Sequence, residues 1–302
     1  MANKLTIVGL GEALWDVLPS GPVLGGAPLN AACHAAQMLQ ARGGCGVVAS
    51  RVGRDPLGDA VVRELERRGM SAEYLQRDSA HATSTVQVEI HNSQPTYIFA
   101  PDIAWDHLHF TPEWAEFATS CDAVCFGTLA QRSPQSRKAI WQFLDAAPQA
   151  IRLFDVNLRQ GFYDRESISE GCRRATLLKL NEHELAVIAE VFKISSGPID
   201  GQLCELRAMH ELEAVVFTRG ERGTLLVLGD QVIDPPIIRY PAAPNADAVG
   251  AGDACSAGIL VGWLLEWPPA RIAAFANRLG AFVASQPGAT PELPLTMSAE
   301  IE

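Results

Sequence analysis

The segment NADAVGAGDACSAG, residues 245–258, places small residues between two aspartates and directly before an apolar stretch. We predict a helix that starts near Asp253, and the first N–H groups of a helix have no acceptor within it. Glycines allow close approach of a phosphoryl group, and the helix dipole favours its negative charge. The pattern therefore predicts an anion site at the amides of Gly250, Ala251 and Gly252, with Asp253 placed to take a proton from an alcohol.

A simpler interpretation of Asp253 is that its side chain only caps a buried helix. That interpretation accounts for Asp253 alone. It leaves unexplained both the Gly-Ala-Gly run and the preceding Asp247, so we favour a chemical role for the segment.

A cationic candidate stands in the sequence DVNLR, residues 155–159. The planar guanidinium of Arg159 matches the geometry of a phosphate group, so Arg159 is the predicted phosphate clamp. We expect Asn157 to face the same cleft.

These residues are separated by apolar runs of strand length that alternate with helical patterns. Strands are predicted for LTIVGLG, GVVASRVG, TVQVEI, AVCFG, IRLFDVN, LLKLN, AVVFTRG and GTLLVLG. Helices are predicted for APLNAACHAAQMLQARG, PLGDAVVRELERRGM, SRKAIWQFLDAAP, NEHELAVIAEVF and DACSAGILVGWLLEW. This order indicates an α/β fold with a mainly parallel central sheet flanked by helices, whose ligands bind beyond the carboxyl ends of the strands.

One region breaks the alternation. Residues 83–105 indicate two strands around a polar turn at Asn92–Pro95, without a crossover helix. The stretch from Glu12 to Gly25 alternates as well and is expected to pair with this hairpin. We predict a small β-sheet lid formed by about residues 12–32 and 83–105 within a single domain spanning residues 1–302.

Composition narrows the function class. The chain has 302 residues, of which 48% are hydrophobic and 20% charged, which is typical of a globular protein. Its formal net charge of −11 argues against nucleic-acid and anionic-membrane partners. The N-terminal apolar run is too short for a signal peptide or a membrane span, so we expect a cytoplasmic protein with free cysteines.

Two segments more than 200 residues apart carry a family resemblance. DAVGAGD resembles the C-terminal signature of the ribokinase-like (PfkB) carbohydrate kinases, and LGGAPLNAACHAAQM is similar to their N-terminal signature. The elements SRVGRDPLG, DVNLR, KLNEHE and TRGERG fall between them in the family's order. The resemblance covers nearly the whole chain and implies a ribokinase-like fold and ATP-dependent phosphorylation of a sugar hydroxyl.

The resemblance also assigns roles to individual positions. It implies that Asp253 is the catalytic base, that the amides of residues 250–252 form the anion hole, and that Asp16 accepts sugar hydroxyls. The residues expected to complete the sugar site are Gly25, Gly26, Asn30, Asn157 and Arg159.

A second set of residues is implied for the cofactors, ATP and Mg²⁺. This set contains Asn181, Glu184, Thr218, Gly220, Gly223 and Asp247, with Glu184 approaching the metal through water. The resemblance further implies a monovalent cation such as K⁺ near Asp247 and Gly288.

The opening GEALWDVLP resembles the fructokinase branch, so fructose is the expected acceptor. The alternatives are a nucleoside kinase, with Trp15, Tyr97 and Phe99 as a platform for a base, and a sugar-binding regulatory protein without catalysis. We also expect a homodimer through lid residues such as Val86, Val88 and Ile98.

Two further segments have open interpretations. PDIAWDHLHF, residues 101–110, is either a packed loop or part of the hinge or the sugar pocket. A zinc site from His107, His109, Cys121 and Cys125 has usable ligand types, but we favour buried cysteines and surface histidines.

Overall fold

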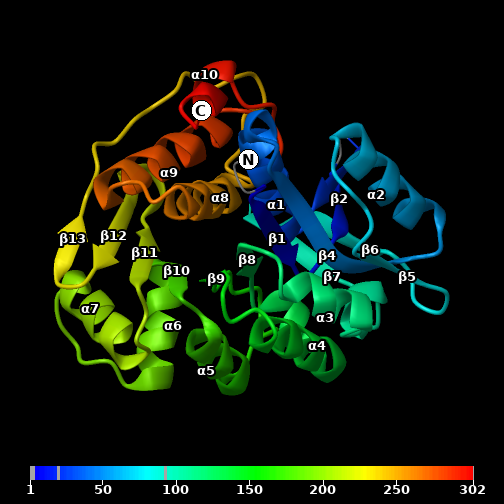
Figure 1. The fold of residues 1–302 in the computed structure, drawn as a ribbon, viewed down its shortest axis with the longest axis horizontal. Coiled ribbons are helices and arrows are strands. Elements are labelled where there is room, and N and C mark those ends of the chain that lie inside the picture. The colour runs from blue at the N-terminus through cyan, green and yellow to red at the C-terminus, as the bar shows by residue number, and fades with distance from the viewer. Residues whose placement is uncertain (1–3, 19–20, 92–93, 302) are drawn as a thin grey trace.

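A large sheet forms the centre of the molecule in the computed structural model, which describes residues 4–18, 21–91 and 94–301 (Figure 1). Within these residues the sheet has nine strands, which lie in the spatial order β13 (Gln231–Ile233), β12 (Thr224–Leu228), β11 (Ala214–Thr218), β10 (Leu177–Asn181), β9 (Ile151–Asp155), β8 (Ala123–Phe126), β1 (Thr6–Leu10), β4 (Cys45–Gly53) and β5 (Leu75–Asp78). Strand β12 pairs antiparallel with both β11 and β13, and the other neighbours pair in parallel.

Helices cover both faces of this sheet, as the alternating pattern predicts. The helices are α1 (Ala27–Leu39), α2 (Pro56–Arg67), α3 (Pro112–Ala118), α4 (Pro134–Asp145), α5 (Arg165–Arg174), α6 (Glu182–Phe192), α7 (Ile199–Met209), α8 (Ala251–Leu264), α9 (Pro269–Val283) and α10 (Leu295–Ala299). Short 3₁₀ turns occupy residues 40–42, 104–107, 129–132 and 220–222.

The side-chain alternation of β1 shows the two apolar layers. Ile7 packs with α1, α8 and α9 on one face, whereas the adjacent Val8 packs in the cluster that includes α3 to α7 on the other face. Both side chains have no exposed surface. A strand buried on both faces must be apolar throughout, which explains the continuous run TIVGL.

A second, four-stranded sheet stands beside the large one. Its spatial order is β3 (Gly21–Gly25), β2 (Leu14–Leu18), β6 (Ser84–His91) and β7 (Gln94–Phe99). Strand β2 pairs in parallel with β6, so the segment after Glu12 does join the predicted hairpin. We call these four strands the small sheet; the centre of the predicted hairpin turn, residues 92–93, lies outside the described residues.

The structure corrects one predicted boundary and adds elements to those predicted. Residues 27–32 belong to α1 rather than to the small sheet, because the chain turns at Gly26 and buries most of this first helical stretch. Helix α8 begins at Ala251, two residues before Asp253 and so near the predicted start, after Gly250 in the left-handed conformation. The strands and helices predicted from the sequence do not include the short strands β5 and β13 or the helices α3, α5, α7, α9 and α10.

Candidate active site

Asp253 is the third residue of α8, directly after the glycine turn. Gly250 has a φ of +78°, and a Cβ atom added to it would lie 2.2 Å from the carbonyl oxygen of Ala289. Only glycine fits that position. Among the described residues no acceptor is found for the N–H groups of Gly252 and Asp253, whereas the N–H of Ala251 lies 3.3 Å from the carbonyl oxygen of Ala248.

A side chain from the other end of the sequence reaches Asp253. The amide Nδ2 of Asn30, in α1, donates to Oδ2 of Asp253 over 2.8 Å. Burial, with the nearby charge of Asp155, raises the pKa of Asp253 to about 6, although the Asn30 hydrogen bond acts in the opposite direction. The oxygen of the same Asn30 amide, Oδ1, is buried without a hydrogen-bond partner in the structure.

Asp16 lies on β2 of the small sheet, next to Gly25. A Cβ atom at Gly25 would lie 2.3 Å from Oδ2 of Asp16, so glycine leaves the room that this carboxylate occupies. Gly26 has a φ of +113°, and a Cβ atom there would lie 2.4 Å from the carbonyl oxygen of Glu12. Burial raises the pKa of Asp16 to about 6. The sequence therefore needs both glycines to seat Asp16 and to start α1.

Arg159 faces the same carboxylates from beyond the carboxyl end of β9. Its positive charge lowers the pKa values of Asp16 and Asp253 against the larger effect of burial. It is exposed and forms no ion pair with a described residue. Asn157, two residues earlier, is partly buried and has a φ of +40°.

Glu12 is a site residue that the motifs do not identify. It follows β1, is 3% exposed, and its Oε2 has no hydrogen-bond partner in the structure. Burial raises its pKa to about 7, while the charge of Arg159 lowers it and that of Asp253 raises it. The available sequence signal was the charged residue between the apolar β1 and β2, in GEALWD.

A buried ion pair under the glycine turn was also missed. Nζ of Lys179 lies 2.7 Å from Oδ2 of Asp155, and the hydroxyl of Ser256 donates to the same oxygen over 2.8 Å. A Cβ atom at Gly252 would lie 3.4 Å from Nζ of Lys179, which places the ammonium group beside the first turn of α8. A lysine within the apolar strand LLKLN was the sequence signal.

Asn181 and Glu184 form a reciprocal cap on α6. Glu184 accepts from the N–H of Asn181 at 2.8 Å and from that of Leu158 at 3.1 Å, and Asn181 Oδ1 accepts from the N–H of Glu184 at 3.0 Å. Burial, with the charge of Asp155, raises the pKa of Glu184. The pair is thus fixed at the carboxyl end of β10, and Glu184 binds the backbone of the loop that follows β9.

A pocket of about 650 Å³ lies beside this pair. Its lining includes Asn181, Thr218, Gly220, Gly223, Ala251 and Gly252. The first turn of α8 forms part of its wall, so the structure brings most of the predicted cofactor residues together. Glu184 and Asp247 are not among the residues that line it.

Asp247 instead holds the loop that follows α9. Its Oδ2 accepts from the N–H of Gly288 over 3.1 Å, and Oδ1 accepts from the N–H of Val249 over 2.9 Å. The buried ring of His34, in α1, contacts the carbonyl oxygen of Ala289 in the same loop through Nε2 at 3.0 Å. The loop therefore packs between α1 and the glycine turn.

The structure gives less support to the two alternatives, the zinc site with cysteine ligands and the aromatic platform for a nucleoside base. All seven cysteines are free, and Cys121 and Cys125 are buried. In the proposed base platform, the indole N–H of Trp15 donates to Leu57 and Phe99 packs edge-on against Phe162. The side chain of Tyr97 lies outside the described part of the structure.

Known proteins are similar to this chain in sequence over most of its length. The sequence profile of the pfkB family carbohydrate kinases matches residues 22–295. A fructokinase of Klebsiella pneumoniae is 30% identical over 306 residues, which cover 94% of this chain and 95% of that protein.

Solved structures show the same fold. A fructokinase of Xylella fastidiosa with bound ATP superposes with a TM-score of 0.83 at 20% identity, over 99% of this chain and 98% of that one. A double-mutant fructokinase of Vibrio cholerae with fructose, ADP and potassium superposes with a TM-score of 0.77 at 24% identity, again over 99% and 98% of the two chains. The ribokinase-like fold implied by the motifs is confirmed.

Proposed function

The chain belongs to the pfkB family of carbohydrate kinases, and from this premise we propose that it phosphorylates a primary hydroxyl of fructose with ATP. The enzyme is an ATP-dependent sugar kinase, as the motifs predict. Fructose as the acceptor is supported by the related fructokinases of Klebsiella pneumoniae and Escherichia coli. The observation that carries the proposal is the partly buried carboxylate of Asp253 in the first turn of α8, hydrogen-bonded to Asn30.

Asp253 is the base in this proposal. The acceptor hydroxyl passes its proton to the Asp253 carboxylate while its oxygen forms a bond to the γ-phosphorus of ATP. The bond from that phosphorus to the bridging oxygen breaks, and its electron pair leaves with ADP. A positioned base of this kind contributes roughly 10²–10⁴-fold to the rate.

The start of α8 stabilises the charge of the transferred group. The free N–H groups of Gly252 and Asp253 point out of the first turn, where the helix dipole also favours an anion. The ammonium of Lys179 lies beneath this turn. We infer that the amides of residues 250–252 bind the γ-phosphoryl group, and that Arg159 contacts it from the opposite side.

The sugar lies between the two sheets in this proposal. Asp16 on β2 accepts hydrogen bonds from sugar hydroxyls, Gly25 and Gly26 make room for it, and the unpartnered Oδ1 of Asn30 accepts a further one. Asn157 faces the same space. The small sheet serves as a lid on a single domain of residues 1–302, and its closure would exclude water and limit ATP hydrolysis.

The pocket beside α8 is the proposed ATP site, with Thr218, Gly220 and Gly223 near the phosphates and ribose. Asn181 and Glu184 are oxygen donors that suit Mg²⁺, and their mutual cap leaves them fixed for contact through metal-bound water. When bound, Mg²⁺ neutralises phosphate charge. Potassium in the Vibrio cholerae relative supports a monovalent-cation site near Asp247 and Gly288 here.

We further propose a cytoplasmic homodimer that associates through the small sheet. Ile98 is 43% exposed and Val17 is 41% exposed, which leaves an apolar surface to cover. Val86, expected at this interface, is 1% exposed and packs within its own chain, and the side chain of Val88 lies outside the described part of the structure. None of the described helices is long and apolar enough to cross a bilayer.

The test measures ADP release with Mg²⁺ATP against fructose, ribose, other hexoses and adenosine, beside the Asp253→Ala variant. We expect turnover with fructose that vanishes in the variant. Turnover with adenosine alone would favour the nucleoside kinase, and sugar binding without turnover would favour a regulatory protein.

A further inference from the structure

Two connections carry the chain between the large sheet and the β6–β7 hairpin of the small sheet. Residues 79–83 lead from β5 into β6, and residues 100–103 lead from β7 into the 3₁₀ turn Ala104–His107. We call these connections the entry strap and the exit strap. They lie side by side, since the N–H of Ala104 donates to the carbonyl oxygen of Ala82 over 2.9 Å.

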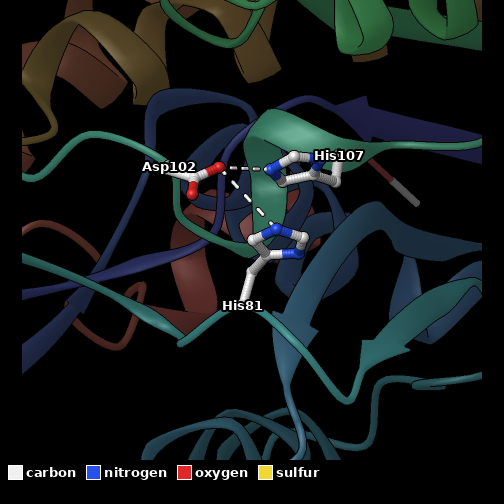
Figure 2. Close-up of side chains that lie close together, drawn as sticks. All are labelled: His81, Asp102 and His107. Carbon is white, nitrogen blue, oxygen red and sulfur yellow. Dashed lines mark hydrogen bonds and ion pairs between the residues drawn. The ribbon is translucent and has the colours of Figure 1, made fainter.

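Three side chains that can bind metals meet across the straps (Figure 2). His81 comes from the entry strap, Asp102 from the exit strap and His107 from the end of the 3₁₀ turn. Their ligand atoms all lie within 4.8 Å of one another. Nε2 of His107 lies 2.7 Å from Oδ1 of Asp102, and Nε2 of His81 lies 3.7 Å from the same oxygen.

A fourth residue determines which nitrogen of His81 is available. Nδ1 of His81 lies 3.0 Å from Oδ2 of Asp78, which also accepts from Nε of Arg51 over 2.7 Å. The ion-paired carboxylate can only accept, so Nδ1 of His81 carries a hydrogen. In the neutral ring the lone pair is then on Nε2 and faces the carboxylate of Asp102. Two acceptors that face each other need a proton or a cation between them.

We propose that Nε2 of His81, Oδ1 of Asp102 and Nε2 of His107 together bind one transition-metal dication of the zinc class. Two imidazoles and one carboxylate are a common ligand set for such ions, with the remaining position open to water. A carboxylate behind a ligating histidine, here Asp78, is the usual support for its orientation.

Binding requires two local changes. Nε2 of His107, which donates to Asp102 without the ion, releases its hydrogen to solvent so that its lone pair can bind. The rings of His81 and His107 are stacked with their centroids 3.5 Å apart and their planes at 13°. Ring lone pairs lie in the ring plane, so the imidazole of His107 turns about its Cβ–Cγ bond toward the ion, while His81 keeps the contact of its Nδ1 with Asp78.

The surrounding contacts hold the ligands in reach of each other. Beside His81, Thr83 donates to Asp55 through its N–H and its hydroxyl, at 2.7 Å each. Beside His107, the guanidinium of Arg132 pairs with both oxygens of Asp106, at 2.8 and 2.7 Å. The ion would thus connect two anchored straps at the base of the small sheet.

Cobalt(II) is the probe for the test, because it takes the zinc geometry and absorbs visible light. Co²⁺ is titrated into the full-length protein, followed by Zn²⁺ as a competitor. We expect one equivalent of Co²⁺ with visible absorption bands, displaced by Zn²⁺ but not by excess Mg²⁺, which prefers oxygen ligands. Displacement by Mg²⁺ would place the ion at the proposed magnesium position beside Asn181 and Glu184, and intense near-ultraviolet bands would indicate a thiolate ligand; either result would overturn the proposal.

Variants locate the ion. His81→Ala, His107→Ala and the isosteric Asp102→Asn should each weaken binding at least tenfold, and Asp78→Asn should weaken it roughly 10–100-fold. His109→Ala is the matched control, since His109 is exposed, two residues from His107, and bonds to Gln135 instead. Circular dichroism verifies that each variant is folded. Unchanged Co²⁺ affinity in the folded Asp102→Asn and His107→Ala variants would refute the site.

Discussion

The carboxamide of Asn30 and the carboxylate of Asp253 are joined by a hydrogen bond of 2.8 Å across a sequence separation of 223 residues. The bond connects the first turn of α1 to the first turn of α8. It favours the ionised form of a carboxylate whose burial favours the protonated form. The proposed base is therefore adjusted by a residue that was expected to contact only sugar.

Replacing Asn30 with Ala should raise the pKa of Asp253. A hydrogen bond to a charged group contributes about 1.5–3 kcal/mol, which corresponds to roughly one to two pH units. The base acts when deprotonated, so the acid limb of kcat/KM should move to higher pH by that amount. Gln142→Ala, an exposed change on α4, is the control, and an unmoved limb in Asn30→Ala would contradict the assignment.

Asp253→Asn should lower kcat by about 10²–10⁴-fold while the melting temperature is kept. In the parent enzyme the pKa near 6 predicts that kcat/KM is constant above pH 7 and declines as the pH falls through 6. With saturating sugar, the residual kcat of the variant should lack the acid limb due to Asp253, whereas kcat/KM keeps the contribution of Asp16, whose pKa is also about 6. Steady-state kinetics between pH 5 and 8 measure both effects, and a variant with parental kcat would exclude Asp253 as the base.

Glu12 should make the protein less stable as the pH rises. Its pKa is 4.5 in the unfolded reference and about 7 in the fold, so between these values the folded state holds more protons. Stability is then greatest at the lower pH and declines toward pH 7, by up to the order of 3 kcal/mol. Glu12→Gln removes this contribution.

Urea unfolding at pH 5 and pH 8 tests this expectation. Asp16 and Asp253 titrate in the same direction in both proteins, so the difference between variant and parent isolates Glu12. The Glu12→Gln protein should gain relative stability at pH 8 only. An equal difference at both pH values would show that Glu12 does not titrate in this range.

Gly25→Ala should weaken sugar binding without affecting ATP. The added methyl group would lie 2.3 Å from Oδ2 of Asp16 and displace this carboxylate. Loss of a charged hydrogen bond predicts a rise in the sugar KM of about ten- to a hundredfold. Gly161→Ala is the matched control, because a Cβ atom there meets nothing within 4 Å. Equal effects on the KM values of sugar and ATP would contradict the role of Asp16.

Lys179→Met should destabilise the protein strongly, because it leaves the carboxylate of Asp155 buried without its ion-pair partner. Breaking a buried pair on one side costs about 3–5 kcal/mol. The double variant Asp155→Asn with Lys179→Met should recover part of this loss. Thermal unfolding of the three proteins measures it, and a double variant less stable than Lys179→Met would argue against the pair.

The sequence was most informative where a glycine or a charged residue breaks a regular pattern. The Gly-Ala-Gly turn marks the start of α8, and the alternation of residues 83–105 marks the small sheet. The boundaries were less predictable because φ values are set by tertiary contacts. The left-handed turn at Gly250 depends on the loop at Ala289, which lies far along the chain.

The missed site residues have a common physical origin. Glu12, Asp155 and Lys179 are buried charged side chains, and the residues next to each of them in the sequence are uncharged. Their roles depend on which strands lie next to each other in the sheet. The local hydrophobic periodicity of a sequence does not determine that strand order. His34 is similar, since its contact with Ala289 exists only once α1 and the loop after α9 meet.

The parallel pairing of β2 with β6 has a mechanical consequence for the substrate. Asp16 belongs to the small sheet, whereas Asp253 belongs to a helix packed on the large one. Any rotation of one sheet relative to the other changes the gap between the two carboxylates. A sugar bound by both carboxylates would therefore fix the distance between them. The angle between the two sheets in the closed state would then depend on the size of the sugar.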